Sequence, residues 1–309
     1  MIATSLLRKG SMSSTSPNPN AKVSEERPVH PATIALLRHV RDAADRRGTD
    51  FVVAGATARD IVLWHVHGVR AERATRDIDV AVCAISWEAH GDLVGELEAT
   101  GLFKADSKAQ QTLVFRDPAD GWALPLDLVP FGDLEAPAGS IAWPPKGDFV
   151  MNVLGFREAV DHAIAIDLGD NLAVPVVTLP ALTLLKVLAW HDRRTRKNTD
   201  ASDLLLVLRS YFRAANEERI WEAAADLLVE YGYNVDLAAS ALLGREARQI
   251  ALPATLDAVT AILADEASYE TLRRDMLARA AAQLLDDFAD ASDKTLAAFR
   301  HGFLATSAR

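Results

Sequence analysis

Two aspartates that begin an apolar strand constrain this chain more than any other feature. The segment Asp77-Ile78-Asp79-Val80-Ala81-Val82 puts Asp77 and Asp79 on one face, because successive strand side chains point to opposite faces. Two carboxylates this close repel each other and resist desolvation unless a cation or a proton lies between them. The pattern predicts a divalent-metal site, and the alternative is an ordinary solvated strand start.

The segment before this strand predicts an anion site. A short buried strand, Phe51 to Val53, turns at Gly55 into a helix that runs through Trp64. The free backbone N–H groups at such a helix start can cradle a triphosphate. The alternative is that Gly55 only makes a tight turn. The following loop, 68–76, can return the chain beside the first strand and bring the cradle to the carboxylates.

A third acid lies inside another apolar strand. Asp127 interrupts the segment Ala123 to Val129, which ends at Pro130 and Gly132. On a strand next to that of Asp79, at the usual spacing of about 4.7–4.9 Å, Asp127 completes a cluster of three carboxylates. The alternative is an edge-strand acid that faces water.

Length and composition indicate a globular chain of two domains. The chain has 309 residues, of which 50% are hydrophobic. Its longest uncharged apolar run, 171–185, is interrupted by two prolines and is shorter than the roughly 20 residues of a membrane span. The single cysteine, Cys83, excludes an intrachain disulfide, which suits the cytoplasm. We therefore expect a cytoplasmic protein with no membrane segment.

The charge balance makes any contact with RNA local. The formal net charge is −10, so the overall field repels polyanions. The densest group of cations is the segment 191–197, which contains Arg193, Arg194, Arg196 and Lys197. These cations either meet phosphates or form a solvated helix end, where positive charge also suits the helix dipole.

The pattern along the chain divides it into three parts. Residues 1–28 are rich in Ser, Pro and Asn and predict a disordered tail. Residues 29–178 predict an α/β (α+β) domain with a small mixed sheet. From residue 179 to 309 the apolar residues recur at helical spacing, which predicts an all-helical C-terminal domain.

Four segments together resemble the DNA polymerase β-like nucleotidyltransferase superfamily, and most closely the bacterial AbiEii/AbiGii toxin-type nucleotidyltransferases. The segments are Gly55-Ala-Thr-Ala-Arg-Asp60, Thr75-Arg-Asp-Ile-Asp79, Leu126-Asp-Leu-Val-Pro-Phe-Gly132 and Leu184-Leu-Lys-Val-Leu-Ala-Trp-His-Asp-Arg193. The resemblance covers roughly residues 50–211. The Gly-x-x-x-Arg-Asp turn is also similar to that of tRNA nucleotidyltransferases, which share the fold.

The resemblance implies transfer of a nucleoside monophosphate from an NTP to an acceptor hydroxyl, with release of pyrophosphate. By matched positions, Asp77, Asp79 and Asp127 hold two Mg²⁺ (or Mn²⁺) ions and are the catalytic residues. Two such ions can clamp the attacking and leaving oxygens. The implied nucleotide-binding residues are Gly55, Ala56, Thr57, Lys186, Asp192 and Arg193.

Three of these assignments keep an alternative. Lys186 either contacts the NTP phosphates or is a lysine that snorkels from an amphipathic helix. Ala56 stands where relatives usually carry Gly or Ser, and the hydroxyl of Thr57 is expected to substitute. The usual Lys-Asp pair is here Lys197-Asn198, which leaves either Asp200 or Asp203 for the acidic role.

The sequence does not identify the acceptor. The expected activity is that of a toxin that modifies tRNA or another RNA, with a cognate antitoxin as partner. The alternatives are an antitoxin-type adenylyltransferase that modifies a partner protein, and a non-catalytic nucleotide-binding module. The three intact carboxylates favour an enzyme over the binding module.

Overall fold

The computed structural model describes residues 21–70, 77–196, 199–214, 217–278 and 286–305. Most of the expected N-terminal tail, residues 1–20, lies outside this part of the chain, as do Thr75, Arg76, Lys197 and Asn198 of the sequence motifs. None of the described helices combines the length and the apolar character that crossing a membrane requires.

A mixed sheet of eight strands forms the base of the fold, in the order β1-β9-β10-β2-β3-β6-β5-β4. A separate hairpin is formed by β7 and β8. The strands are β1 (Ala21–Lys22), β2 (Phe51–Ala54), β3 (Ile78–Cys83), β4 (Phe103–Ala105), β5 (Thr112–Arg116), β6 (Ala123–Phe131), β7 (Ser140–Ala142), β8 (Val150–Asn152), β9 (Ile164–Asp167) and β10 (Ala173–Val176).

The three strands that carry the sequence motifs are neighbours in the middle of this sheet. β2 and β3 pair antiparallel, with Ala54 opposite Asp79. β3 and β6 pair parallel, with Asp79 opposite Asp127. The predicted placement of Asp127 beside Asp79 is therefore confirmed, and the edge-strand alternative is wrong.

The expectation of a small sheet is wrong, because short strands extend it at both edges. β9 and β10 have four residues each, too few to show an alternating pattern, and β10 pairs with β2. Residues 21–28 also belong to the fold. β1 pairs with β9, and the Arg27 Nε donates to the Trp64 carbonyl at 3.0 Å.

From Leu179 onward the described secondary structure is helical. The helices of the described residues are α1 (Pro31–Arg47), α2 (Gly55–Asp60), the π-helix η1 (Ile61–Val66), α3 (Trp87–Ala99), α4 (Phe156–Asp161), α5 (Leu179–Arg193), α6 (Thr199–Ser210), α7 (Glu217–Ala223), α8 (Ala225–Glu230), α9 (Val235–Ile250), α10 (Pro253–Ala264), α11 (Glu266–Leu277) and α12 (Asp286–Leu304).

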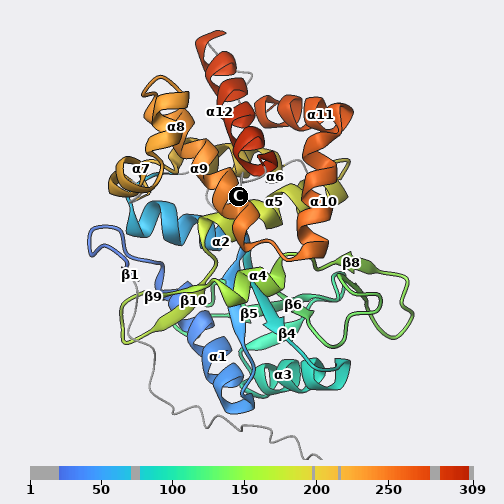
Figure 1. Ribbon diagram of the computed structural model, residues 1–309. Coiled ribbons are helices and arrows are strands. Elements are labelled where there is room, and N and C mark those ends of the chain that lie inside the picture. The colour runs from blue at the N-terminus through green and yellow to red at the C-terminus, as the bar shows by residue number, and fades with distance from the viewer. Residues whose placement is uncertain (1–20, 71–76, 197–198, 215–216, 279–285, 306–309) are drawn as a thin grey trace, which may run out of the picture.

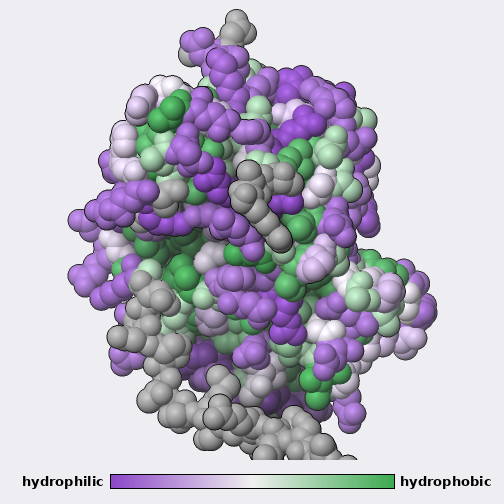
Figure 2. Space-filling view, viewed as in Figure 1, coloured by the Kyte–Doolittle hydropathy of each residue, from purple (hydrophilic) through white to green (hydrophobic). Residues whose placement is uncertain are grey.

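The helices form two groups around the sheet. In Figure 1, α1 and α3 lie together at one end of the molecule, and α7 to α12 gather at the other. α5 connects these parts, because it packs against α2 and α4 on one side and against α6 and α9 on the other. On the face shown in Figure 2, hydrophilic residues predominate and hydrophobic residues form smaller patches. This arrangement sets α5 directly over the end of the sheet that carries the aspartates.

Candidate active site

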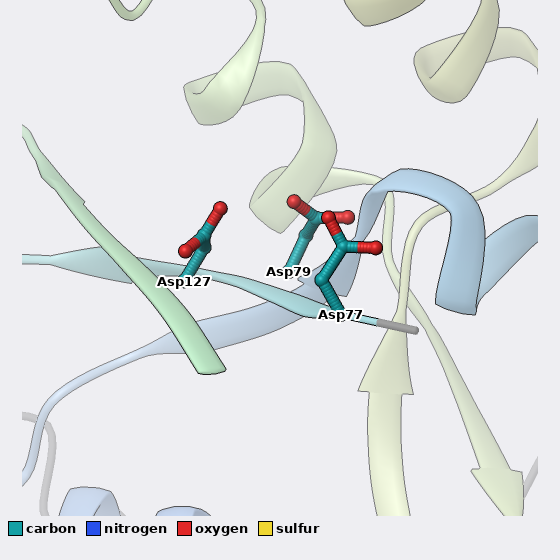
Figure 3. A group of neighbouring side chains, drawn as sticks. All are labelled: Asp77, Asp79 and Asp127. Atoms are coloured by element: carbon teal, nitrogen blue, oxygen red, sulfur yellow. The ribbon is translucent and has the colours of Figure 1, made fainter. Parts of the chain in front are cut away.

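Three carboxylates meet at the junction of β3 and β6. One oxygen from each of Asp77, Asp79 and Asp127 lies within 4.8 Å of the others, a spacing that could hold a metal ion. Figure 3 shows the three side chains directed to the same side of the sheet. Asp77 immediately precedes β3, and Asp79 and Asp127 are register partners on β3 and β6. The structure therefore contains the cluster of three carboxylates that the sequence predicted.

Two threonines hold this cluster in place. The Thr57 hydroxyl donates to the backbone carbonyl of Asp77 at 2.9 Å, and the Thr112 hydroxyl donates to Asp127 Oδ1. Thr57 is buried, as is Ala56 beside it. We expected Thr57 to offer its hydroxyl to phosphates, but that hydroxyl is committed to fixing the start of β3.

Gly55 makes room for the Asp79 carboxylate. Its φ is +61°, and a Cβ built on it would lie 1.8 Å from Asp79 Oδ2. Any other residue would therefore strain the backbone and displace the carboxylate. The interpretation of Gly55 as only a tight turn is incomplete, because the close approach to Asp79 also requires a glycine.

The crowding of carboxylates changes the acidity of the central one. Burial, and after it the negative charge of Asp77, raises the pKa of Asp79 to about 6. The positive charges of Lys186 and Arg193 act in the opposite direction without outweighing them. Asp79 is therefore held in a position where a cation would relieve a large electrostatic cost.

Opposite the carboxylates, a buried ionic network joins α2, α5 and α6. Lys186 Nζ lies 3.0 Å from Asp200 Oδ1 and 2.8 Å from Asp203 Oδ2. Arg193 donates two hydrogen bonds to Asp200, at 2.6 and 2.8 Å. Arg59 pairs with Asp203 from the side of α2. The network extends from α2 to the end of α5 through alternating charges.

The network bears on two alternatives left by the sequence. Lys186 does not snorkel, because it is only 5% exposed and ends in two carboxylates. Asp200 and Asp203 both contact Lys186, so these contacts do not single out one of them for the acidic role. Burial alone would lower the pKa of Lys186, but the charges of Asp203 and Asp200 raise it. Burial alone would raise the pKa of Asp200, but hydrogen bonds from Arg193 and the charge of Lys186 lower it to about 2.

A cavity of about 380 Å³ separates the carboxylates from α5. Its size falls within the usual range for small-molecule sites. The charged and polar residues in its lining are Asp79, Gln111, Asp127, Asn152, Lys186, Asp192, Arg193, Arg196 and Asp200. The apolar lining consists mainly of Val129, Phe149, Val150, Met151, Leu154, Phe156, Leu182, Leu185 and Leu188.

The residues predicted for nucleotide binding divide between lining and support. Gly55, Lys186, Asp192 and Arg193 line the cavity. Ala56 and Thr57 lie outside the lining and support it from behind.

Sequence reasoning missed the apolar wall that the hairpin supplies. Phe149, Val150 and Met151 follow a Pro-Pro-Lys-Gly segment with no alternating pattern, so nothing in the sequence marked them. Sequence reasoning also assigned Arg196 only to the basic segment 191–197. In the structure, Arg196 lines the cavity and is exposed, and no carboxylate of the described residues forms an ion pair with it. Its charge is thus uncompensated, unlike that of Lys186.

The comparison with protein families identifies one match over most of the chain. The family model described as nucleotidyl transferase AbiEii toxin, Type IV TA system, matches residues 36–300. No curated protein matches the chain.

Several solved structures are distantly similar. An antigenic nucleotidyltransferase-like protein from Paracoccidioides brasiliensis is 16% identical with a TM-score of 0.41, covering 69% of this chain and 94% of its own. ANT(2'')-Ia in complex with adenylyl-2''-tobramycin is 17% identical with a TM-score of 0.37, covering 60% and 98%. The Thermotoga maritima CCA-adding enzyme complexed with tRNA is 12% identical with a TM-score of 0.24, covering 91% and 80%. At such scores these likenesses assign no substrate.

The raised pKa of Asp79 predicts that Asp79→Asn stabilises the metal-free protein at neutral pH. The carboxyl has a pKa of about 6 in the folded state against its ordinary value of 3.8, so the folded state bears the cost of ionisation above pH 6. That cost disappears as the pH falls from 6 to 4. Urea unfolding in EDTA should show Asp79→Asn more stable by up to about 3 kcal/mol at pH 8. The advantage should vanish near pH 4, and a pH-independent difference would contradict the electrostatic explanation.

The contact between Gly55 and Asp79 predicts that Gly55→Ala is far more damaging than a matched substitution elsewhere. Gly48 has φ +60°, but a Cβ there would meet nothing within 4 Å. Gly48→Ala should therefore cost only the left-handed backbone strain, about 1–2 kcal/mol. Gly55→Ala adds the collision with the carboxylate and should cost clearly more in urea unfolding. Equal losses in the two variants would show that Asp79 moves aside freely.

Proposed function

Because the chain belongs to the AbiEii nucleotidyl transferase toxin family, we propose that it transfers a nucleoside monophosphate from an NTP to an acceptor hydroxyl and releases pyrophosphate. The observation that carries this proposal is the group of three carboxylates, which faces the cations of α5 across a cavity large enough for a nucleotide. The catalytic assignment of Asp77, Asp79 and Asp127 is part of the proposal.

The residues present fit divalent metal ions. Magnesium prefers oxygen ligands at about 2.0–2.1 Å, so two ligands on opposite sides of one ion are about 4.2 Å apart. The three carboxylate oxygens lie within 4.8 Å of one another, so small movements of the side chains would bring them to the spacing around one ion. The raised pKa of Asp79 also shows that Lys186 and Arg193 offset the cost of its negative charge only in part. When bound, Mg²⁺ or Mn²⁺ would neutralise phosphate charge and activate the acceptor hydroxyl.

The chain's own residues would position the nucleotide. Asp77, Asp79 and Asp127 would hold the metal, and the apolar wall formed by Phe149, Val150 and Met151 would exclude water on one side. Lys186 carries a charge that Asp200 and Asp203 already balance, so we assign it the positioning of α5 over Asp79 as well as the predicted phosphate contact. Arg196 is the cation best able to add net positive charge at the phosphates.

Membership of the family does not identify the acceptor molecule. The family description names a toxin of a Type IV toxin–antitoxin system, which supports a cognate antitoxin as partner. We propose that the acceptor is RNA, including tRNA. A partner protein is the alternative acceptor that the labelling assay would reveal. We also propose residues 29–178 as the nucleotidyltransferase domain and 179–309 as a helical domain that closes the cavity through α5.

The proposal predicts that Asp77→Asn, Asp79→Asn and Asp127→Asn each reduce nucleotide transfer at least about 100-fold, because even indirect supports of metal ligands contribute 10–100-fold. The assay is incubation with each labelled NTP, Mg²⁺ and either total RNA or lysate protein, followed by measurement of label in each fraction. Asp257→Asn, at an exposed carboxylate on α10, is the control.

A second readout separates metal binding from catalysis. Mg²⁺ or Mn²⁺ at 100 times its Kd should stabilise the unmodified protein by about 2.7 kcal/mol, and the three variants should lose this gain. Full transfer by any of the three variants would overturn the site. Label in protein but not in RNA would replace the RNA acceptor.

The uncompensated charge of Arg196 predicts that Arg196→Gln weakens NTP binding about tenfold, while kcat at saturating NTP changes less. Arg194 is the matched control, because it lies on the same helix end but stacks on Trp190 at 5.1 Å and does not line the cavity. Lys186→Ala is a poorer test, because removing one partner of a buried ion pair costs about 3–5 kcal/mol of stability. Titration of each variant with NTP, followed by fluorescence or calorimetry, measures the effect. Equal NTP affinities for the Arg194 and Arg196 variants would refute the assignment.

A further inference from the structure

A second cavity, of about 730 Å³, lies beyond the ionic network from the candidate active site. Arg59 and Asp203 line this second cavity, whereas Lys186 and Asp200 line the first. The buried ion pairs are therefore the wall that the two cavities share. The other elements around the second cavity are the chain after η1, the N-terminal end of α9, the end of α11 and the first half of α12.

The charges in this second cavity are predominantly positive. Arg70, Arg209 and Arg213 line it with at least part of their surface accessible, and no carboxylate of the described residues forms an ion pair with any of the three. Lys294 is balanced by Asp290 at 2.7 Å, and Arg59 by Asp203. Among the described residues of the lining, Asp236 is the remaining acid. A positive cavity on a chain of net charge −10 is a local exception that attracts an anion.

One of these arginines is held against an aromatic ring. The Arg209 guanidinium carbon lies 4.1 Å from the centroid of Phe288. This stacking restrains the guanidinium, and a restrained planar cation can pair with a phosphate or stack on a nucleobase. The lining also contains apolar side chains, including Leu206 and Leu237, against which a base can pack. A ligand that carries both phosphates and bases matches this combination better than inorganic phosphate does.

We propose that the second cavity binds a single-stranded segment of the RNA acceptor, an inference that rests on the proposed nucleotidyl transfer. Asp200, at the first cavity, and Arg209, at the second, are nine residues apart on α6. At 1.5 Å per residue these two lining residues are about 13 Å apart along this helix, and the cavities themselves meet at the shared wall of ion pairs. A strand of a few nucleotides is long enough to span this distance, so an acceptor bound in the second cavity would have its end within reach of the first. An acidic protein surface, with carboxylates but no bases, would leave the stacked guanidinium and the apolar lining unused.

The test is binding of a fluorescent single-stranded oligoribonucleotide in EDTA and without NTP, at several salt concentrations. The double variant Arg209→Gln, Arg213→Gln should bind about tenfold more weakly or worse. Its slope of log affinity against log salt should be smaller by about 1.4, because each lost phosphate contact contributes about 0.7 for a single strand. Asp236→Asn, which removes the opposing acid, should bind more tightly than the unmodified protein.

The controls distinguish this proposal from a general charge effect and from the function of the first cavity. Lys104→Gln, Arg116→Gln removes the same charge at the far edge of the sheet and should leave affinity and slope unchanged. Unchanged melting temperatures establish that the variants are folded. Since neither metal nor NTP is present, failure of the transfer reaction cannot affect the outcome. Loss of nucleotide transfer with intact RNA binding would count against the proposed function alone.

Three results would overturn the proposal. The first is equal affinity and salt slope for the Arg209, Arg213 variant and the Lys104, Arg116 control. The second is a polyglutamate peptide of equal charge that binds as tightly as the RNA and depends on the same arginines, which would indicate an acidic protein partner. The third is displacement of the RNA by inorganic phosphate at an equivalent phosphate concentration, which would indicate a site for a small anion.

Discussion

The buried ionic network between α2, α5 and α6 is the interaction on which the site depends. It contains Lys186 and Arg59 against Asp200 and Asp203, and Arg193 closes it at the end of α5. Each charge is paired with a neighbour from another helix, so a change in the mutual arrangement of the three helices would separate buried ion pairs. Breaking such a pair costs about 3–5 kcal/mol, because it leaves an uncompensated charge in a buried position. The network thus fixes α5 above the sheet and fixes the first cavity with it.

The carboxylate cluster differs from this network, because the fold brings like charges together there instead of pairing opposite ones. Asp77, Asp79 and Asp127 are crowded by backbone geometry, since two lie on one strand face and the third is a register partner on the next strand. Gly55 leaves space for Asp79, and Thr57 ties the start of β3 to α2. The result is a buried Asp79 carboxylate whose pKa stays raised although Lys186 and Arg193 of α5 act to lower it. That residual cost of ionising Asp79 is what makes a cation favourable beside it.

The positively charged side chains of the two cavities have two different roles. In the first cavity, Lys186 is neutralised by two aspartates, whereas Arg196 forms no ion pair with a carboxylate of the described residues. In the second cavity, Arg59 is neutralised, whereas Arg209 and Arg213 form no ion pair within the described part of the chain. Paired cations hold helices in place, and unpaired ones at the cavity surface can bind anions. An acidic net charge is compatible with a polyanionic acceptor because attraction at such short range depends on local charge.

The sequence by itself determined the local features of this protein. The two-residue period of a strand put Asp77 and Asp79 on one face, and the runs of apolar residues predicted β2 and β6 close to their observed bounds. It did not predict the edge strands, which are too short to carry a pattern, nor the apolar wall at Phe149. Only the tertiary structure decided that Asp127 lies opposite Asp79, that Asp79 fills the space beside Gly55, and that Lys186 ends between Asp200 and Asp203. The physical reason is that these contacts join side chains of different elements, whose distances are set by sheet register and helix packing and are encoded in no single segment.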